Sequence, residues 1–388
     1  MAHHCSLASL VPHSRYFAPG DITVAPEEQF QISRFAYIRH ETDLVLSSPL
    51  GHAHLILTSA DALVVYHRLC KGASAAELIE VLAGRVSEAE VLELLRMMIA
   101  CQIVDRPAAL PPENAHSRAL QMWEFHDLLM QAESRFGRSL ARVGGDHRFL
   151  DKLAAPPAVK PIPWPGRRIP LYVPPPDAPF HRVSLEQALA TRRSAREQGA
   201  EPISLAEVGE FFYRTARILS LTDATWPREY PHGGEYTRRA YPCGGSRYEQ
   251  ELYIAVDRCS GLDRGLYYYD ALDHQLVEVA GPTRDLEQLL MMSTMASGGC
   301  RTQTLVTIAA RFQRTGWKYR GLAFALQLKN AGVLLAHMYL VAAGLGLVSC
   351  GLGAGDSDLF ARLAGLEYLE ESSICEFQLG SRLVDPAG

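Results

Sequence analysis

The pattern of apolar and polar side chains identifies a set of strands in the C-terminal half of the chain. In ELYIAV, Leu252, Ile254 and Val256 alternate with Glu251 and Tyr253, which predicts a strand. Further strands are predicted in RGLYYYD, HQLVEVA, TLVTIAARF and CEFQLGSRL, and a central buried helix in GLAFALQLKNAGVLLAHMYLVAAGLGL. Strands and helices do not alternate regularly, and no G-x-G-x-x-G opens a helix after a strand. The pattern therefore favours one α+β domain over residues 179–388 and disfavours a Rossmann fold.

Residues 30–105 show a second pattern, in which short strands are followed by helices. The pieces FAYIRH, DLVLSSPL and AHLILTS precede three helical segments, which begin at the capping residues Ser59, Ser74 and Ser87. This order predicts a winged-helix-like docking module. The stretch has many acidic residues and no basic recognition helix, which favours binding a peptide or protein over DNA. Packing against the larger domain is the alternative role. Residues 1–29 are predicted to be a flexible N-terminal tail.

Residues 106–178 differ in composition from both flanks and predict a helical and proline-rich linker. LQMWEFHDLLMQAESRFGRSLARV has the period of one long amphipathic helix. In LAAPPAVKPIPWPGRRIPLYVPPPDAP the density of proline disfavours both a helix and a strand ladder. We therefore expect this stretch to lie extended over another surface of the protein.

Composition restricts the partners of this 388-residue chain. Its net charge of −5 lacks the surplus of Lys and Arg that a nucleic-acid-binding protein needs. The start has no apolar run typical of a signal peptide, and His337 and several glycines interrupt the most apolar window. We therefore expect a soluble cytoplasmic protein that does not bind a membrane. The eight cysteines form no C-x-x-C and no Cys/His cluster, which favours neither a disulfide framework nor a metal site.

Three segments have compositions suited to holding a ligand. TRRSAR gathers arginines and a hydroxyl near a predicted helix end, where they either complement the helix terminus or bind a phosphate. YPCGG is either a plain turn or bare backbone that presents N–H groups to a planar ligand. In GLGLVSCGLGAGDSD the glycines after Gly346 exceed what a helix end needs. They either form a flexible loop or lie close against a ligand.

GWKYRG places Lys318 and Tyr319 between an apolar strand and the buried helix. A lysine withdrawn from water has a lowered pKa and can act as a base, whereas a loop lysine in solvent has no such role. No G-x-S-x-G, H-E-x-x-H or P-loop motif occurs in the sequence. Serine hydrolase, zinc protease and NTPase activities therefore have no support.

Taken together, these segments resemble the SagB-type azoline dehydrogenases, a branch of the FMN-dependent nitroreductase-like superfamily, from about Leu44 to the C-terminus. The family patterns W-x-F-H-D-x-L…S-R-x-G and R-x-Y-P-S-G-G-x-x-Y-x-x-E-x-Y correspond to WEFHDLL…ESRFGR and RRAYPCGGSRYEQELY. SLEQALATRRSAR, RGLYYYD, WKY and LGLVSCGLG occur in the family's order. The resemblance implies a nitroreductase-like FMN-binding fold, with a central, mostly antiparallel sheet flanked by helices.

The resemblance also implies the cofactor FMN and the residues that hold it. The arginine cluster would bind the phosphate and ribityl chain, and PCGG would run along the isoalloxazine with N–H groups near N5 and O4. The second glycine segment would cover another edge of the ring. In this superfamily the flavin lies at a homodimer interface, so that the partner chain would supply some contacts. The implied FMN-binding residues are Arg192, Arg193, Ser194, Arg196, Pro242, Cys243, Gly244, Gly245, Gly351, Leu352, Gly353 and Arg382.

The activity that the resemblance implies is oxidation of a thiazoline or oxazoline to the aromatic azole in natural-product biosynthesis. The substrate would be borne by a peptide or a carrier protein, with a cyclodehydratase or a peptide synthetase as partner. The ring loses a proton from the carbon beside the carbonyl and a hydride to flavin N5, and oxygen reoxidises the flavin. Lys318 is implied as the base, and Tyr319 as its hydrogen-bonding or proton-relay partner.

The sequence departs from the family pattern in three segments. Cys243 replaces the usual serine, Gln198 stands where an aromatic residue often follows the arginines, and the central helix reads Asn-Ala-Gly-Val from Asn330 in place of Glu-Ala-Gly-His. Two other functions remain open. One is an NAD(P)H-dependent nitro- or quinone reductase on the same fold, which needs no Lys-Tyr pair. The other is a non-enzymatic scaffold whose first hundred or so residues bind a peptide or partner.

Overall fold

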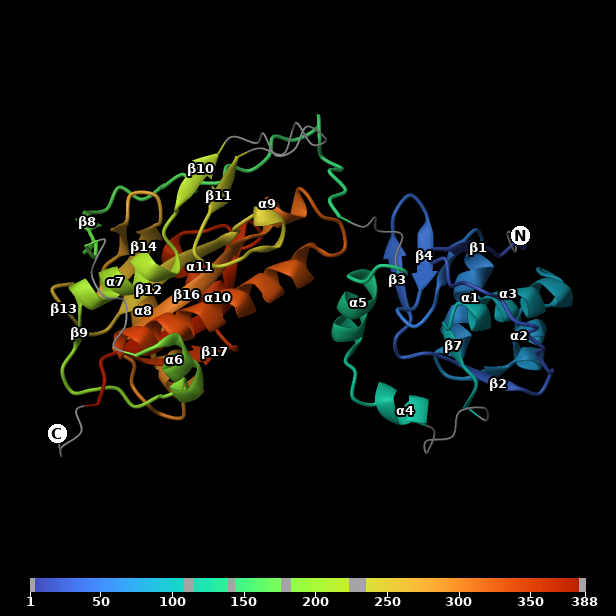
Figure 1. Cartoon of the computed structure of the whole chain (residues 1–388). Helices are drawn as coiled ribbons and strands as arrows, with labels where there is room; N and C mark the ends of the chain where they lie inside the picture. The colour runs from blue at the N-terminus through green and yellow to red at the C-terminus, as the bar shows by residue number, and fades with distance from the viewer. Residues whose placement is uncertain (1–3, 108–114, 139–143, 176–182, 223–234, 384–388) are drawn as a thin grey trace. The chain divides into compact units, whose positions relative to one another are not determined.

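The computed structural model describes residues 4–107, 115–138, 144–175, 183–222 and 235–383. The chain divides into two compact units, residues 1–146 and 147–388 (Figure 1). The boundary falls inside the predicted linker, so that its helical part belongs to the first unit and its proline-dense part to the second. Stretches of the predicted linker and the first residues of the predicted tail lie outside the described residues: 1–3, 108–114, 139–143 and 176–178.

The first unit combines two small antiparallel sheets with helices. The larger sheet has the strand order β1-β5-β4-β3, and the smaller has the order β6-β2-β7. Its strands are β1 (Ala8–Pro12), β2 (Gln29–Ile32), β3 (Tyr37–His40), β4 (Leu44–Ser47), β5 (Ala53–Leu57), β6 (Ala73–Ser74) and β7 (Val104–Asp105). Its helices are α1 (Ala60–Leu69), α2 (Ala75–Val81), α3 (Glu88–Ala100), α4 (Ala115–Leu120) and α5 (Phe125–Glu133).

Helices α1, α2 and α3 begin at the predicted serines. The hydroxyls of Ser59, Ser74 and Ser87 accept hydrogen bonds from N–H groups of the first helical turn. Ser74 and Ser87 also form capping boxes with Glu77 and Glu90. These contacts join residues at most three positions apart, which is why the sequence pattern locates the helix starts well.

The predicted flexible tail is wrong for residues 8–12. They form β1, which pairs antiparallel with β5. Leu7, Ala8 and Leu10 are buried in the apolar core of the first unit, together with side chains of α1 and α3. Burial of these side chains stabilises a short edge strand that has little strand-forming pattern of its own.

The predicted long amphipathic helix over residues 120–143 is also wrong, because in its described part α5 covers only Phe125–Glu133 and α4 ends at its first residue. α4 ends at Leu120 and α5 begins at Phe125. Between them, the guanidinium of Arg34 donates hydrogen bonds to the carbonyl oxygens of Leu120 and of Trp123, the latter at 2.9 Å. Carbonyl groups that would continue a helix are satisfied by this distant side chain instead.

The second unit is built on a seven-stranded sheet in which every strand pair is antiparallel. Its order is β17-β18-β16-β12-β14-β15-β8, which matches the predicted meander and terminal strand. The strands are β8 (Arg168–Pro170), β12 (Gln250–Val256), β14 (Gly265–Asp270), β15 (Gln275–Ala280), β16 (Thr304–Arg311), β17 (Val348–Leu352) and β18 (Glu371–Gly380). Two smaller ladders join β9 (Ile203–Ser204) to β13 (Cys259–Ser260), and β10 (Ser220–Thr222) to β11 (Tyr236–Arg238).

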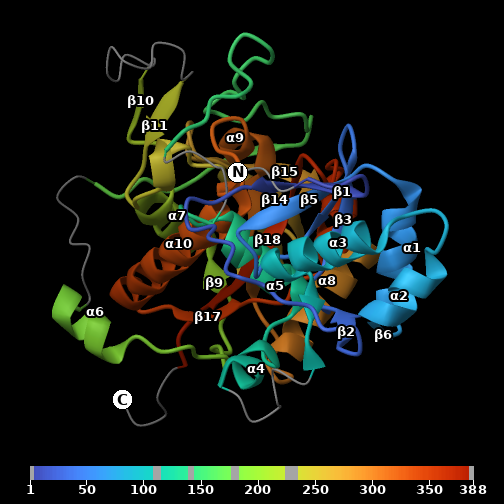
Figure 2. The ribbon, with the colours of Figure 1, turned by 90° about the vertical axis from the view of Figure 1, so that its right-hand side faces the viewer.

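Helices cover both faces of this sheet. α7 (Leu205–Thr215) and α10 (Ala323–Leu345) pack on one face, with Leu252, Ile254 and Val256 of β12. α8 (Arg284–Ala296) and α11 (Ser357–Ala364) pack on the other, with Tyr253 and Ala255. Figure 2 shows α10 and α8 on opposite sides of β18. The predicted alternation along β12 therefore divides two apolar cores.

One helix of the described residues, α10, is apolar and long enough to cross a membrane by length and composition. It was predicted to be a buried core helix. Leu334, Met338 and Val341 join the apolar core with α7, and Gly346 ends the helix with a left-handed backbone, φ +71°. Other faces of α10 carry exposed apolar side chains, among them Phe324, Leu328 and Val333.

The proline-dense segment lies extended over the sheet, as predicted, and also joins it. Trp164 packs against Tyr253 and Tyr268 and donates its indole N–H to the carbonyl of Ala364 at 2.9 Å. Contrary to the expectation that proline denies a strand ladder, β8 pairs with β15 through residues 168–170. Pro170 is tolerated there because β8 is the edge strand.

Candidate active site

The turn between β11 and β12 needs its two glycines because other side chains fill the space beside them. A Cβ on Gly244 would lie 2.5 Å from a methyl carbon of Leu326 on α10. Gly245 has a left-handed backbone, φ +64° and ψ +18°, and a Cβ there would overlap the hydroxyl of Tyr319. The bare backbone predicted in PCGG therefore lets this turn approach both α10 and Tyr319.

The predicted catalytic pair lies against that turn. α9 (Phe312–Gly316) is followed by Lys318 and Tyr319, whose N–H groups both donate to the carbonyl of Thr315, at 3.1 and 3.0 Å. The Lys318 amine is 3.3 Å from the point where a Cβ of Gly245 would stand. Tyr319 is buried and Lys318 is half-buried. The structure thus brings together two predicted groups that are more than seventy positions apart in the sequence.

The surroundings of the pair favour its uncharged form. Burial, and then the positive charges of Arg247 and Arg314, lower the pKa of the Lys318 amine. Burial raises the pKa of the Tyr319 hydroxyl. A neutral amine can accept a proton, and a protonated phenol can donate a hydrogen bond. Both pKa shifts are therefore in the direction that a base and its hydrogen-bonding partner need.

A buried carboxylate holds the glycine turn from the inside. The N–H of Gly244 donates to Oδ1 of Asn330 at 2.9 Å, and Nδ2 of Asn330 donates to the fully buried Glu249 at 2.8 Å. The Cys243 thiol lies 3.5 Å from the same carboxylate. The expectation that PCGG offers its N–H groups to a ring is corrected at Gly244, whose N–H is already occupied.

The arginine cluster follows α6 (Leu185–Thr191) and lies beside the predicted glycine segment. Tyr339 of α10, which sequence analysis missed, joins them. Its hydroxyl is 2.8 Å from the hydroxyl of Ser194 and accepts a 2.6 Å hydrogen bond from the N–H of Gly351. The guanidinium of Arg192 lies 5.2 Å from the centre of the Tyr339 ring. The only sequence signal for Tyr339 was a phenol within a largely apolar helix. Its neighbours in the sequence do not indicate that it contacts Ser194 and Gly351.

All four arginines of the predicted site are exposed. Arg382 was predicted in the terminal strand, but β18 ends at Gly380, and Arg382 lies beyond it with its backbone against Gly199. In the part of the chain that the structure describes, no ion pair is formed by four of the predicted arginines, which leaves their guanidinium groups available to an anionic ligand. These are Arg192, Arg193, Arg196 and Arg382.

Within one chain, these residues form two groups on opposite sides of α10. Leu326 and Asn330 contact the glycine turn, whereas Tyr339 contacts Ser194 and Gly351. Nine positions along an α-helix correspond to about two and a half turns and about 13 Å. Asn330 and Tyr339 therefore leave α10 in opposite directions. Figure 1 shows α9 and β11 near one end of α10, and α6 and β17 near the other.

A cavity of about 600 Å³ lies between α6, α7 and α10, and none of the predicted site residues lines it. Its lining includes Leu185, Ala188, Arg214, His337 and Val341. Apolar side chains dominate this lining, and the cavity lies outside both groups of predicted site residues.

Gly355, the last glycine of GLGLVSCGLGAGDSD, lies beside a buried carboxyl group. A Cβ on Gly355 would overlap the side chain of Glu376, which is 4% exposed, and Oε2 of Glu376 has no hydrogen-bond partner among the described residues. Burial raises the pKa of this carboxyl to about 7. Its ionisation therefore opposes folding at neutral and alkaline pH.

Replacing Glu376 with glutamine is expected to stabilise the protein at pH 8. In the unfolded chain the Glu376 carboxyl ionises near its ordinary pKa, whereas in the folded protein it ionises only near pH 7. Its destabilising effect on the fold therefore grows between these two pH values and is complete above them. Urea unfolding should show a gain on the order of 2 to 3 kcal/mol at pH 8 that fades toward pH 5. Glu367→Gln, at an exposed position, is the control and should show neither. A loss of stability at pH 8 would contradict this account of Glu376.

Comparison with known proteins finds two family matches. Residues 30–140 match the cyanobactin oxidase ThcOx, and residues 189–380 match the nitroreductase family. A putative nitroreductase of Methanocaldococcus jannaschii is 25% identical over 176 residues, 45% of this chain and 81% of that protein. The trifolitoxin-processing protein TfxB of Rhizobium leguminosarum bv. trifolii is 29% identical over 119 residues, 29% of this chain and 32% of that relative. A putative nitroreductase structure from Ralstonia eutropha, at a TM-score of 0.42 and 20% identity, covers 60% of this chain and 100% of that one.

Proposed function

Because this chain carries a nitroreductase-family domain and a cyanobactin oxidase domain, as its resemblance to the SagB-type azoline dehydrogenases predicts, we propose that it is an FMN-dependent azoline oxidase. It would convert a thiazoline or oxazoline to the aromatic azole during natural-product biosynthesis. The relative that processes trifolitoxin supports this branch over a general nitroreductase. The nitroreductase-like α+β fold predicted for the second unit is confirmed.

The observation that carries the proposal is the position of Lys318 and Tyr319 at the glycine turn. The amine of Lys318 and the hydroxyl of Tyr319 converge on Gly245, where the resemblance places the reacting ring. In the proposed reaction, the uncharged amine takes the proton from the carbon beside the carbonyl. The Tyr319 hydroxyl orients that amine or relays the proton. A reductase that takes hydride from NAD(P)H has no need for this base.

The residues present fit FMN. Four exposed arginines that form no ion pair with any described residue, together with the hydroxyl of Ser194, suit a phosphate. Nothing lies within 4 Å of the place where a Cβ of Gly353 would stand, so a flat ring could approach the backbone there, whereas Gly245 and Gly351 face the hydroxyls of Tyr319 and Tyr339. When bound, the flavin would supply the hydride acceptor, and oxygen would reoxidise it. The remaining residues that we assign to FMN binding are Pro242, Cys243, Gly244, Leu352 and Gly353.

We further propose that the site is completed by a second copy of the chain. The two residue groups on opposite sides of α10 would meet only across a homodimer interface, each group facing the opposite group of the partner. Exposed apolar side chains on α6 and α10, including Leu185, Leu189 and Phe324, support a subunit contact there.

Light scattering on the purified protein should give twice the 42.8 kDa chain mass. Charging the contact through Leu189→Glu should lower both the mass and the flavin content, because half of each site would then be missing. A monomer that retains stoichiometric flavin would contradict the shared site. Arg301→Gln, at an exposed position ion-paired with Asp257 away from α6, is the control.

The first unit would deliver the substrate. We propose that residues 30–105 bind the peptide or carrier that bears the azoline ring, or the cyclodehydratase or synthetase that makes it, in the cytoplasm. The separate compact unit of small sheets and helices described above and the match to the cyanobactin oxidase support a docking role. Deletion of a pure docking module would remove activity on the carried substrate while leaving the flavin bound.

A spectrum and a substrate assay test the proposed function together. The purified protein should be yellow, and it should convert a thiazoline to a product lighter by two hydrogens without added nicotinamide. Bleaching of the flavin by NAD(P)H in anaerobic solution, without azole formation, would support the reductase alternative instead. Colourless protein that takes up no FMN would end the flavin proposal.

A further inference from the structure

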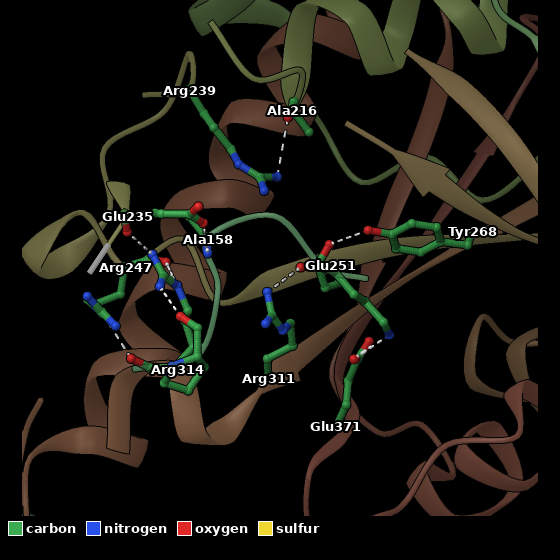
Figure 3. Close-up of polar contacts among 12 residues, drawn as sticks. Ala158, Ala216, Glu235, Arg239, Arg247, Glu251, Tyr268, Arg311, Arg314 and Glu371 are labelled. Carbon is green, nitrogen blue, oxygen red and sulfur yellow. Dashed lines mark hydrogen bonds and ion pairs between the residues drawn. The ribbon is translucent and has the colours of Figure 1, made fainter. Parts of the chain in front are cut away.

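Two arginines beside the proposed base form a reciprocal pair. Arg247 and Arg314 are fully buried, and the Nε–H of each donates to the backbone carbonyl of the other, both at 2.9 Å (Figure 3). Arg247 follows Gly245 by two positions, and Arg314 lies in α9, four positions before Lys318. The two hydrogen bonds therefore join the glycine turn to the segment that carries the Lys-Tyr pair.

Arg314 also binds two further segments. Its two terminal nitrogens donate to the carbonyl of Pro156 at 2.6 Å and to the carbonyl of Glu235 at 2.9 Å, at the start of β11 (Figure 3). Each partner is a backbone carbonyl, and the guanidinium presents its N–H groups in a rigid fork. One side chain thus holds the glycine turn, α9, β11 and the proline-dense segment in a single arrangement.

The pair acts on Lys318 through charge as well as through position. Among the described residues, the titratable groups facing the Lys318 amine are Arg247 from the glycine turn, Arg314 from α9, Tyr236 from β11 and the neighbouring Tyr319. Both arginines lower the pKa of Lys318, after burial. Burial of two like charges is expensive, and a purely structural cross-link between backbone carbonyls does not require a positive charge next to a lysine.

We propose that Arg247 and Arg314 are positioning residues for the proposed oxidation. They hold Lys318 and Tyr319 against Gly245 and keep the amine in a positively charged, water-poor setting that favours its uncharged form. The inference rests on the proposed function, because only there does Lys318 accept a proton from substrate. Neither arginine contacts the substrate in this scheme.

Variants of Arg314 separate position from charge. Arg314→Gln removes both the positive charge and the guanidinium hydrogen bonds. Arg314→Lys keeps a positive charge but loses the forked arrangement of N–H groups. We expect Arg314→Gln to lower kcat about 100-fold, in line with the effect of misplacing a catalytic group by about 1 Å. Arg314→Lys should lose most of the same activity. Neither should release the flavin. The matched control is Arg362→Gln, which removes an exposed arginine of α11 that is ion-paired with Asp285 of α8. This variant should keep wild-type kcat.

A second measurement is independent of activity. Reductive methylation reacts with uncharged amines, so its yield at Lys318 against pH, measured by peptide mass spectrometry, gives the titration midpoint of that amine. The exposed Lys329 serves as an internal reference. We expect the Lys318 midpoint to lie below the ordinary lysine range in the wild type, to rise in Arg314→Gln, and to rise less in Arg314→Lys. The pH–rate profile should move in the same direction.

The two measurements distinguish failure of this inference from failure of the proposed function. If wild-type protein forms no azole but the Lys318 midpoint shifts as described, the function fails and the positioning stands. If azole forms, and Arg314→Gln keeps kcat within twofold of wild type and the Lys318 midpoint within error of wild type, the proposed positioning role is wrong. Should Arg314→Gln not fold, Arg247→Lys carries the same two readouts and the same criteria.

Discussion

Replacing Lys318 with alanine is expected to abolish azole formation while leaving FMN bound. The proposed base contributes only its amine, which lies at Gly245 on the side of α10 opposite the arginines that we assign to the phosphate. Loss of a general base typically costs about 10²- to 10⁴-fold in rate. Turnover of a thiazoline substrate and the flavin absorbance of the purified variant measure the two properties separately.

The pH dependence gives a second signature of the same residue. Because burial and two arginines lower the pKa of Lys318, the uncharged fraction rises with pH below the ordinary lysine range. The wild-type rate should therefore increase with pH on a limb that Lys318→Ala lacks. Lys329→Ala, at an exposed position of α10, should keep the wild-type profile. Normal turnover in Lys318→Ala would remove the lysine from the mechanism.

Replacing Lys160 with methionine is expected to destabilise the second unit by about 3 to 5 kcal/mol. Its amine donates to the hydroxyl of Tyr253 at 2.6 Å and to the carboxylate of Glu371, and it lies 4.8 Å from the centre of the Trp164 ring. Burial raises the pKa of Glu371, and Lys160 opposes that rise. Without the lysine, a carboxylate is left buried with no cation beside it.

Urea unfolding at several pH values tests this prediction. A carboxyl whose folded pKa is raised opposes folding above its unfolded pKa, so the loss in Lys160→Met should be larger at pH 8 than at pH 5. Lys160→Met combined with Glu371→Gln should recover much of the loss, because no charge then remains buried. A loss below about 1 kcal/mol, typical of an exposed ion pair, would contradict the account.

The Lys160 contact also bears on the site, since it anchors the proline-dense segment to the sheet. Pro156, four positions earlier, accepts a hydrogen bond from Arg314, and the N–H of Ala158 donates to Glu235 at 3.2 Å. Figure 3 shows Ala158 and Glu235 beside Arg247 and Arg314. We therefore expect Lys160→Met to lower kcat as well as stability, through the position of Arg314.

Local sequence patterns located five strands of the second unit, its long apolar helix and the residues most suited to chemistry. The alternation along β12 and the serine caps of the first unit depend on neighbours within a few positions, which a linear pattern records. The glycines of the turn were visible for the same reason, because a left-handed backbone or a close approach excludes other residues. The resemblance then assigned the arginine cluster and the Lys-Tyr pair.

Contacts between distant segments settled what those patterns left open. Glu249 and Asn330 occupy the N–H of Gly244, Tyr339 joins Ser194 to Gly351, and Arg247 meets Arg314 only because β12 and α9 fold together. In the first unit, Arg34 binds a carbonyl group at the start of a predicted helix, 86 positions away in the sequence. Such hydrogen bonds have no local period, since each depends on two chain segments that the fold alone brings within reach.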